Sequence, residues 1–390
     1  MSRKIIFFCV FMTFSGCNSE SGEGDNLMPD AGNGIDAGTD NDFDSGKDDN
    51  PDASLQDSGE DYDHCWNVMD ASFPEDISFT SIWGSSPEDI FAAGIIYQPE
   101  SEISRGYIFH YNGQSWNKMD TPEMPIINSI HGSGSDSVYA VGANMAAYFY
   151  NGNDWTVIHD SYGDTMREIQ DVWVSDADDI YAIVLFHIHA GNTVSEIHHY
   201  NGEEMQMGIM ENMRFMGIWG TSDNNIYISA IGNDKEGGII FHYDGKEGSS
   251  AEENFNVDVY RDVWGDSAEN FYMVGSIWNE DGTDVEESKI IHYDGSSWMI
   301  VQDAIPFELR NLTGSSADDV YAAGINFNYE TLNMVEGALY HYNGNEWSRM
   351  KIPGNWFISG LWAAYKGEAY AVGGYINDHS ARIFRYSCDM

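Results

Sequence analysis

The chain has 390 residues, of which 42% are apolar and 14% aromatic, enough for one large globular domain or two ordinary ones. It carries 64 acidic residues against 17 basic ones, a formal net charge of -47. A surface this negative repels nucleic acid, so we expect no nucleic-acid partner, and it favours cations or basic partners instead.

The first seventeen residues, MSRKIIFFCVFMTFSGC, have the pattern of an export signal. A basic pair precedes the apolar stretch from Ile5 to Phe14, which is too short to span a bilayer as a helix, since that takes about twenty residues. The Ser-Gly-Cys that follows resembles the lipobox of bacterial lipoproteins. The resemblance implies that Cys17 is lipidated and that residues 1–17 are the signal, and Asn18 after it implies the outer membrane. The alternative is an ordinary secretory signal that happens to contain Cys17.

Residues 18–64 are predicted to be a disordered acidic linker. They hold fifteen acidic residues, three Glu and twelve Asp, against the single base Lys47. Large apolar residues are nearly absent, so the segment cannot bury enough surface to offset its chain entropy, and its charges repel one another. We therefore interpret it as a tether between a membrane and a folded head.

From Ile77 onward one phrase occurs seven times, as in SIWGSSPEDIFAAG and DVWGDSAENFYMVG. Two slots for small residues, always ten positions apart, mark each copy. The first slot is occupied by Gly84, Gly132, Val174, Gly220, Gly265, Gly314 and Ala363. The second is occupied by Gly94, Gly142, Val184, Ala230, Gly275, Gly324 and Gly373.

Each copy continues into a second phrase such as IFHYNGQSW or IIHYDGSSW. Asn-Gly or Asp-Gly between apolar runs is a strong hairpin signal, because both residues tolerate positive φ in a tight turn. Each repeat therefore predicts four short strands, the first of them represented by SIW. One such sheet cannot bury both faces, but seven packed radially can. The predicted fold is all-β: a seven-bladed β-propeller of four-stranded antiparallel blades over residues 65–390.

The last copy ends in FRYSCDM, after its third strand. Its missing fourth strand is predicted at the other end of the folded region, where CWNVMD from Cys65 to Asp70 matches SWNKMD from Ser115 to Asp120. The N-terminal strand would thus close the last blade. Cys388 then lies beside Cys65, and in an oxidising extracytoplasmic compartment the two should form a disulfide.

The repeat resembles bacterial BNR/Asp-box and kelch-like propellers over roughly residues 65–390. The YAVG and YNGQSW phrases follow the kelch order of glycine, Tyr and Trp, and YDGSSW at Tyr293 to Trp298 resembles a shortened Asp-box. The resemblance implies a bacterial propeller-repeat lipoprotein. Propellers include sialidases, oxidases, lectins and scaffolds, so the fold alone does not choose a function.

Residues that recur once per blade are interpreted as structural, because equivalent positions around a ring are too far apart to form one site. The recurring histidines are His110, His199, His242, His292 and His341. The recurring tryptophans, expected to pack between blades, are Trp83, Trp173, Trp219, Trp264 and Trp362. Non-repeating His187 and His189, with His198, are the best metal ligands in the sequence, but they lack the ligand number and spacing of a zinc site. We expect no metal and no cofactor.

Four arginines form the first candidate ligand site, because in blades 3 to 6 each precedes the inner-strand Trp slot by three to six residues. They are Arg167, Arg214, Arg261 and Arg310. Together they could bind a carboxylate or phosphate near the central channel. The alternative is that each pairs with a neighbouring acid such as Glu168, Asp262 or Glu308. The variable loops on the same face are the second candidate. Their ligand-binding residues would be Tyr97, Trp278, Asp281 and Tyr329.

These features favour a monomeric, lipid-anchored cell-envelope propeller that binds a protein or glycan through its loops and has no catalytic residues. The first alternative is a hydrolase or lyase acting on a polysaccharide, which would need a buried carboxylate pair about 5–10 Å apart at the channel mouth. The second is a structural scaffold in an envelope complex.

Overall fold

The computed structural model divides the chain into two units, Met1–Asp61 and Tyr62–Met390, and only the second contains residues described here. The lipidation site Cys17, the linker 18–64 and Cys388 lie outside the described residues. The described ranges are 65–69, 73–74, 76–98, 103–159, 166–187, 193–203, 205–211, 213–232, 237–251, 255–279, 284–328, 333–352, 356–375 and 380–387.

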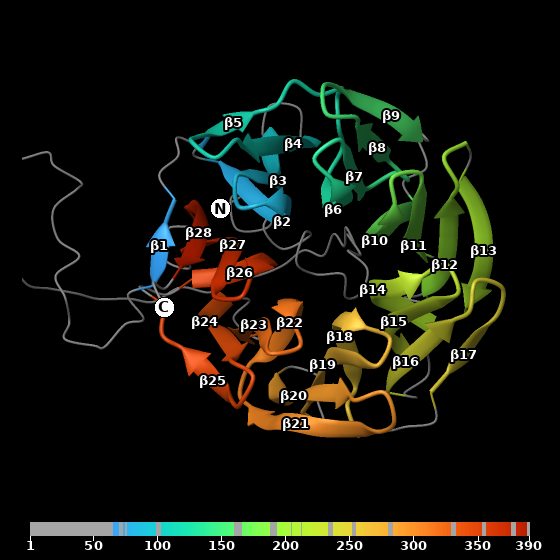
Figure 1. Cartoon of the computed structure of the whole chain (residues 1–390), viewed down its shortest axis with the longest axis vertical. Helices are drawn as coiled ribbons and strands as arrows, with labels where there is room; N and C mark the ends of the chain where they lie inside the picture. The colour runs from blue at the N-terminus through green and yellow to red at the C-terminus, as the bar shows by residue number, and fades with distance from the viewer. Residues whose placement is uncertain are drawn as a thin grey trace, which may run out of the picture. The chain divides into compact units, whose positions relative to one another are not determined.

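Within these ranges, strands β1 to β28 form seven four-stranded antiparallel sheets arranged around an axis (Figure 1). The predicted seven-bladed β-propeller is confirmed. Blade 1 consists of β2 (Ile77–Ser86), β3 (Asp89–Gln98), β4 (Ile103–Tyr111) and β5 (Trp116–Lys118). Blade 2 consists of β6 (Ile127–Gly134), β7 (Ser137–Gly142), β8 (Ala147–Tyr150) and β9 (Trp155–His159). Blade 3 consists of β10 (Arg167–Asp176), β11 (Asp179–His187), β12 (Thr193–Tyr200) and β13 (Met205–Glu211).

The remaining blades repeat this order, with the innermost strand first. Blade 4 consists of β14 (Met213–Ser222), β15 (Asn225–Gly232), β16 (Gly238–Tyr243) and β17 (Gly248–Ser250). Blade 5 consists of β18 (Val259–Ser267), β19 (Asn270–Trp278), β20 (Val285–Tyr293) and β21 (Trp298–Ile305). Blade 6 consists of β22 (Glu308–Ser316), β23 (Asp319–Asn328), β24 (Asn333–Tyr342) and β25 (Trp347–Met350). Blade 7 consists of β26 (Trp356–Tyr365), β27 (Glu368–Tyr375), β28 (Ala381–Ser387) and β1 (Trp66–Val68).

The closure of blade 7 by the N-terminal strand is also confirmed. β1 lies at the outer edge of the sheet beside β28, so the first and last strands are neighbours (Figure 1). Trp66 is the register partner of Tyr386, and the Ser387 amide donates a hydrogen bond to the Cys65 carbonyl oxygen at 3.0 Å. The disulfide to Cys388 stays a prediction, since that cysteine lies outside the described residues.

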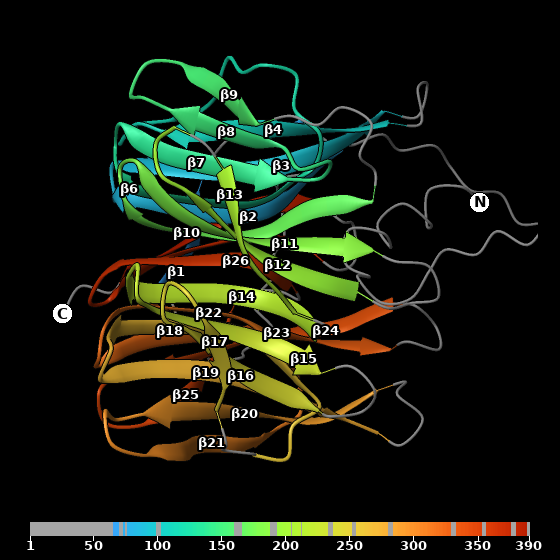
Figure 2. The same ribbon diagram turned by 90° about the vertical axis from the view of Figure 1, so that its right-hand side faces the viewer.

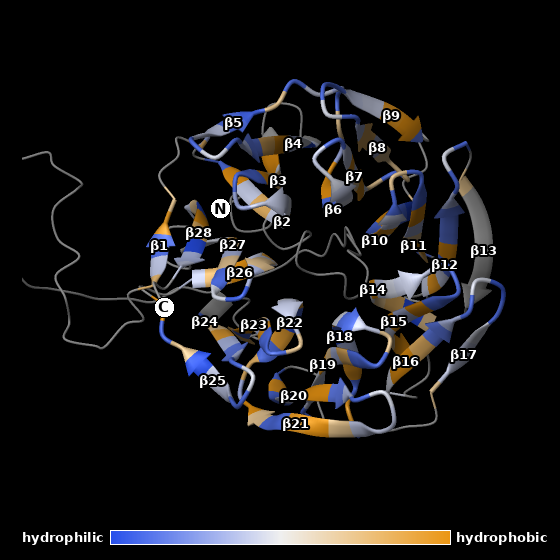
Figure 3. Cartoon of the chain, viewed as in Figure 1, coloured by the Kyte–Doolittle hydropathy of each residue, from blue (hydrophilic) through white to orange (hydrophobic). Residues whose placement is uncertain are grey.

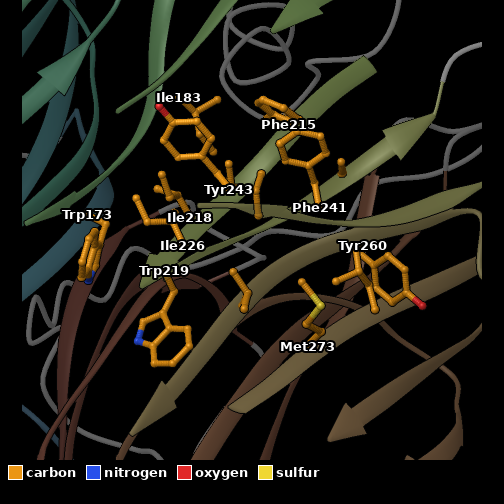
Figure 4. Packing of buried hydrophobic residues seen from close by; sticks show 14 of the residues in the cluster. Trp173, Ile183, Phe215, Ile218, Trp219, Ile226, Phe241, Tyr243, Tyr260 and Met273 are labelled. Carbon is orange, nitrogen blue, oxygen red and sulfur yellow. The ribbon is translucent and has the colours of Figure 1, made fainter. Parts of the chain in front are cut away.

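Apolar side chains fill the space between neighbouring blades. In Figure 3 the middle strands carry orange apolar stretches, whereas the connecting turns are largely blue. Side chains of blades 3, 4 and 5 form one such layer, among them Trp173, Phe215 and Tyr260 (Figure 4). In the side view most strands run roughly horizontally, with β6 to β9 at the top and β18 to β21 at the bottom (Figure 2). Each blade thus buries both faces against its neighbours, which a single sheet cannot do alone.

The recurring tryptophans do pack between blades, and the small-residue slot explains how. A Cβ on Gly314 would lie 2.4 Å from the Cη2 atom of Trp264, the tryptophan of the preceding blade. Gly265 stands in the same relation to Trp219. The two copies that lack the glycine, with Val174 and Ala363, are those that follow a blade with His131 or Thr313 in the tryptophan slot. The slot is therefore small where the facing residue is large.

The recurring histidines are structural as well. His341 Nε2 lies 2.8 Å from Asp319 Oδ1 of its own blade, and its ring stacks on Tyr321 with centroids 4.3 Å apart. The other four bond Asp89, Asp179, Asn225 or Asn270 in the same way. In blade 7 Arg385 replaces the histidine and binds Glu368, a variant that the repeat did not predict.

The Asn-Gly and Asp-Gly turns differ from the prediction in their geometry. Only the glycine has positive φ, as in Gly113 at 83° and Gly344 at 88°. The preceding Asn or Asp instead accepts backbone hydrogen bonds through its side chain; Asn112 Oδ1, for example, bonds the amides of Gln114 at 3.1 Å and Ser115 at 3.0 Å. These residues recur because their side chains cap the turn.

Candidate functional site

The inner strands bring polar side chains from five blades, charged in four of them, to one end of the ring. Each inner strand begins at this end, where the loops between the second and third strands of every blade also open, because the strands of a blade alternate in direction. We call the following set the mouth arc. It consists of Asn128, Glu168, Arg214, Arg261, Glu308 and Arg310.

A bulge in the inner strand positions two of the arginines. In each of the seven inner strands the register shifts by one residue near the start of the strand. The extra residue is Arg261 in β18 and Arg310 in β22. A bulge re-aims the side chain of the extra residue. It is therefore the local reason that these two guanidinium groups reach the same acid.

Arg261 and Arg310 converge on Glu308. Arg261 Nη2 donates to Glu308 Oε1, and Arg310 Nη2 donates to Glu308 Oε2 at 2.6 Å. The carboxylate is only 1% exposed, and Arg261 is 9% exposed. Pairing with a neighbouring acid, the alternative that the sequence left open, therefore holds for these two arginines.

Arg214 differs from its neighbours. Its Nε and Nη2 atoms are buried and have no hydrogen-bond partner among the described residues. Burial and the nearby charge of Arg261 lower the pKa of Arg214 to about 10, while the charge of Glu168 acts in the opposite direction. The group stays protonated at physiological pH, so the arc holds a desolvated cation with unused donors.

Glu168 closes the other end of the arc. Its Oε1 lies 3.0 Å from His187 Nε2, and its Oε2 accepts from Asn128 Nδ2 at 3.4 Å. Burial alone would raise the pKa of Glu168, but the His187 hydrogen bond and the charges of His187 and Arg214 bring it below its ordinary value. This acid is therefore ionised and already has neighbouring donors.

Arg167, the fourth predicted arginine, belongs to a separate group. Its Nη2 atom lies 3.7 Å from Glu196 Oε1, and its Cζ atom lies 5.0 Å from the Phe186 ring centroid. Glu196 is fully buried and its Oε2 atom lies 2.7 Å from His198 Nε2. The four arginines thus divide into three in the mouth arc and one beside the Glu196–His198 pair.

The histidines weighed as metal ligands do not come together. His187 and His198 bond different carboxylates, and His189 lies outside the described residues. No cluster of three or more His, Cys, Asp or Glu side chains suited to a metal occurs in the described part of the chain. That part also contains no helix long and apolar enough to cross a membrane.

Two aspartates follow the bulges of β10 and β18. Asp171 Oδ2 accepts from the Ile218 amide at 3.1 Å and Asp262 Oδ2 from the Leu312 amide at 2.8 Å, each in the next blade. Their Oδ1 atoms are engaged too, Asp171 with the Ser129 hydroxyl and Asp262 with the Val263 amide. Burial raises the pKa of Asp171 to about 6, and burial with the Asp171 charge raises that of Asp262 well above its ordinary value.

The structure describes only some of the predicted loop residues. Asp281 and Tyr329 lie outside the described residues, as does the side chain of Tyr97. Trp278 ends β19, is half-buried, and its amide donates to Asp258 Oδ2 at 2.7 Å.

A small pocket opens between blades 5 and 6 next to the mouth arc. It is lined by Asp284, Val285, Pro306, Glu308, Ile325, Asn326 and Phe327.

Sequence reasoning missed three parts of this region: the amide of Asn128, the inter-blade role of Asp171 and Asp262, and the buried Glu196. A signal existed for the aspartates, because they occupy a slot that is Ser81 and Ser129 in blades 1 and 2. Nothing comparable marked Glu196, since its burial depends on the packing of neighbouring strands.

The fold and the mouth arc define a β-propeller with a polar channel entrance, and solved structures agree on the fold. No protein-family model and no curated protein matches the chain. A structure described as YCF48 bound to D1 peptide matches with a TM-score of 0.56 and 12% identity, over 84% of this chain and 96% of that one. The WD40 β-propeller domain of Doa1 matches with a TM-score of 0.54 and 11% identity, over 82% and 96%. Oligogalacturonate lyase from Vibrio parahaemolyticus matches with a TM-score of 0.51 and 10% identity, over 82% and 96%. At these identities the likeness concerns the fold alone.

Proposed function

We propose that the chain is a lipid-anchored binding module of the bacterial cell envelope that holds a protein or glycan ligand at its mouth arc. The observation that carries the proposal is Arg214, a desolvated cation with unused donors at the end of the ring where the inner strands begin. A buried donor without a partner costs free energy, and a ligand acceptor would remove that cost. The strands that flank the variable loops end on the same side of the ring, and these loops would supply further contacts.

Binding is favoured over catalysis by the hydrogen bonds of Asp171 and Asp262, the two buried aspartates of the inner strands. Hydrolysis of a polysaccharide by a carboxylate pair needs one acid free to donate a proton and another free to attack or to activate water. All four oxygens of Asp171 and Asp262 instead accept hydrogen bonds from the protein. The pair acts as a strut between blades. The similar structures are compatible with this choice, since one is described with a bound peptide, although another is a lyase.

A binding screen tests the proposal. The full mature chain, immobilised, would be probed with an envelope-protein extract and a glycan array, beside an Arg214→Gln variant. An Arg349→Gln variant is the matched control, because Arg349 lies on the outer strand β25 and forms an exposed ion pair with Glu336. We expect a ligand that the control retains and the Arg214 variant loses. Release of shortened products from a bound polysaccharide would instead favour the hydrolase or lyase.

The anchor is tested separately. Cys17→Ser removes the thiol that would carry the lipid, so the variant should move from the membrane fraction to the soluble fraction of cells. The measurement is fractionation followed by mass spectrometry of the N-terminal peptide. An unchanged membrane fraction for the variant would contradict the lipid anchor and leave the binding proposal to its own test.

A further inference from the structure

The position three residues after the start of each outer strand differs between two parts of the ring. The amides of Met69 and Met119 at this position donate to the third-strand carbonyl oxygens of Ile383 and Ile108, each at 2.9 Å, so the position is equivalent in the two blades. The outer strands lie on the rim of the ring (Figure 1). Three consecutive blades, 6, 7 and 1, have methionine there: Met350, Met69 and Met119. The other four blades have Ile158, Gly208, Ala251 and Val301.

These methionines lie at the boundary with the next blade. Each one shares an apolar layer with the tryptophan that begins the next outer strand. Met350 shares its layer with Trp66, Met69 with Trp116, and Met119 with Trp155. The three layers include both boundaries of blade 7, which closes the ring, and the boundary between blades 1 and 2. A flexible, polarizable thioether packs well beside an aromatic ring.

The indole N–H groups of these tryptophans lack a strong acceptor. Trp155 Nε1 donates to the Sδ atom of Met119 at 3.2 Å. A thioether sulfur is a weak acceptor. The Nε1 atoms of Trp66 and Trp116 are buried and have no hydrogen-bond partner among the described residues. A buried donor without a good acceptor costs free energy, so an acceptor placed at the sulfur would stabilise these boundaries.

Oxidation of the sulfur creates such an acceptor. A sulfur lone pair attacks one oxygen of a peroxide, the O–O bond breaks, an S–O bond forms, and the other oxygen leaves as water. Sulfur loses two electrons and the peroxide gains them. In most interiors the polar sulfoxide disrupts packing. Next to Met119, however, the indole N–H already points at the sulfur, and the flexible side chain can shift to place the new oxygen between them.

We propose that Met119 is a site of oxidation by peroxide, and that its sulfoxide oxygen accepts the hydrogen bond of the Trp155 indole, so that oxidation strengthens the contact between blades 1 and 2. Met119 is half-buried, which leaves its side chain within reach of so small an oxidant. Met69 is half-buried too and is the second site of the same kind. Met350 is 7% exposed and should react last of the three. The proposal is independent of the mouth arc and its ligand.

Peptide mapping tests whether the site is oxidised. The full mature chain is treated with dilute hydrogen peroxide, and mass spectrometry measures the oxidised fraction at each methionine. Met166 and Met299, 38% and 39% exposed, are the reference positions. We expect sulfoxide at Met119 under conditions that oxidise both references, and before sulfoxide appears at Met350.

Melting temperatures before and after treatment test the role of the indole. Trp155→Phe keeps an aromatic ring but has no N–H. We expect treatment to lower its melting temperature by about 2 °C more than that of the wild type, the shift that one hydrogen bond gives in a large domain. Adding Met119→Leu to this variant should remove the extra loss. A cooperative melt of each untreated variant shows that it is folded.

Met119→Leu alone keeps the test decisive if Trp155→Phe does not fold. Treatment should lower the melting temperature of Met119→Leu more than that of the wild type, because only the wild type gains the new hydrogen bond, whereas Met299→Leu should show no such excess loss. Absence of sulfoxide at Met119 while Met166 and Met299 are oxidised would overturn the proposal. So would equal shifts in wild type and Trp155→Phe, or a wild type that loses more than Met119→Leu, since oxidation would then weaken the boundary.

Discussion

The pairing of a tryptophan in one blade with a small residue in the next explains why glycine recurs in the inner strands. Trp264 lies against Gly314, whereas Thr313 faces Ala363 one blade further along. Interiors are packed closely enough that a single methyl group must displace something. The space between two blades is therefore filled jointly by two side chains about one repeat apart, and a change in the volume of one requires a compensating change in the other.

Gly314→Ala is predicted to destabilise the protein by about 1–3 kcal/mol, the usual cost of overpacking. The added Cβ would lie 2.4 Å from the Cη2 atom of Trp264 and 2.8 Å from the Asp319 carbonyl oxygen, so the ring or the strand must shift. Trp264→Thr should cost less stability in the Gly314→Ala background than in the wild type, because the double variant copies the Thr313–Ala363 pair of the same chain. Urea denaturation of the single and double variants measures both effects. Additive losses would show that the two positions are not a packing pair.

At the scale of the strand, β1 is the element on which ring closure depends. It has three residues, and its register with β28 places Trp66 beside Tyr386 with ring centroids 5.2 Å apart. Trp66 is 3% exposed and belongs to the apolar layer between blades 6 and 7. A strand this short is held by its side chains and its register, and a covalent link at its end would strengthen it.

The predicted Cys65–Cys388 disulfide should provide that link. It would enclose a loop of 323 residues, the difference between 388 and 65. A bridge of this length stabilises by roughly 5 kcal/mol in the chain-entropy model, less any strain. Cys388→Ser should therefore lower the melting temperature and make blade 7 the first site of proteolysis. Non-reducing peptide mapping of the native protein is the direct check, and free thiols at both positions would contradict the bridge.

At the scale of the whole molecule, the buried charges make stability depend on pH. Asp171 and Asp262 have raised pKa values in the folded state, so the folded protein binds their protons more tightly than the unfolded chain does. Their contribution to the free energy of unfolding is therefore largest in acid and falls as pH rises from about 4 through about 6. Glu168 changes the free energy of unfolding in the opposite direction. Its pKa is lowered in the folded state despite burial, so its contribution is lost as pH falls.

Asp262→Asn should flatten this dependence. The amide cannot ionise, so the difference in melting temperature between wild type and variant should shift in favour of the variant as pH rises from 4 to 7. The comparison at each pH cancels the contribution of Glu168, which both proteins share. Differential scanning calorimetry across that range measures it. A difference in melting temperature that is the same at every pH would mean that folding does not change the protonation of Asp262 between pH 4 and 7.

The sequence by itself determined the fold, because a propeller is built from one local pattern repeated at a near-constant period. The hairpin signals, the small-residue slots and the match of CWNVMD to SWNKMD each depend on neighbouring residues, and they predicted seven blades and their closure. The mouth arc was decided by the tertiary structure. Arg261 and Glu308 are 47 positions apart, and their contact depends on a bulge and on the angle between two blades. Sequence placed Arg214, Arg261 and Arg310 near one another. Only packing decided that two of them bond one acid while the third is left with unused donors.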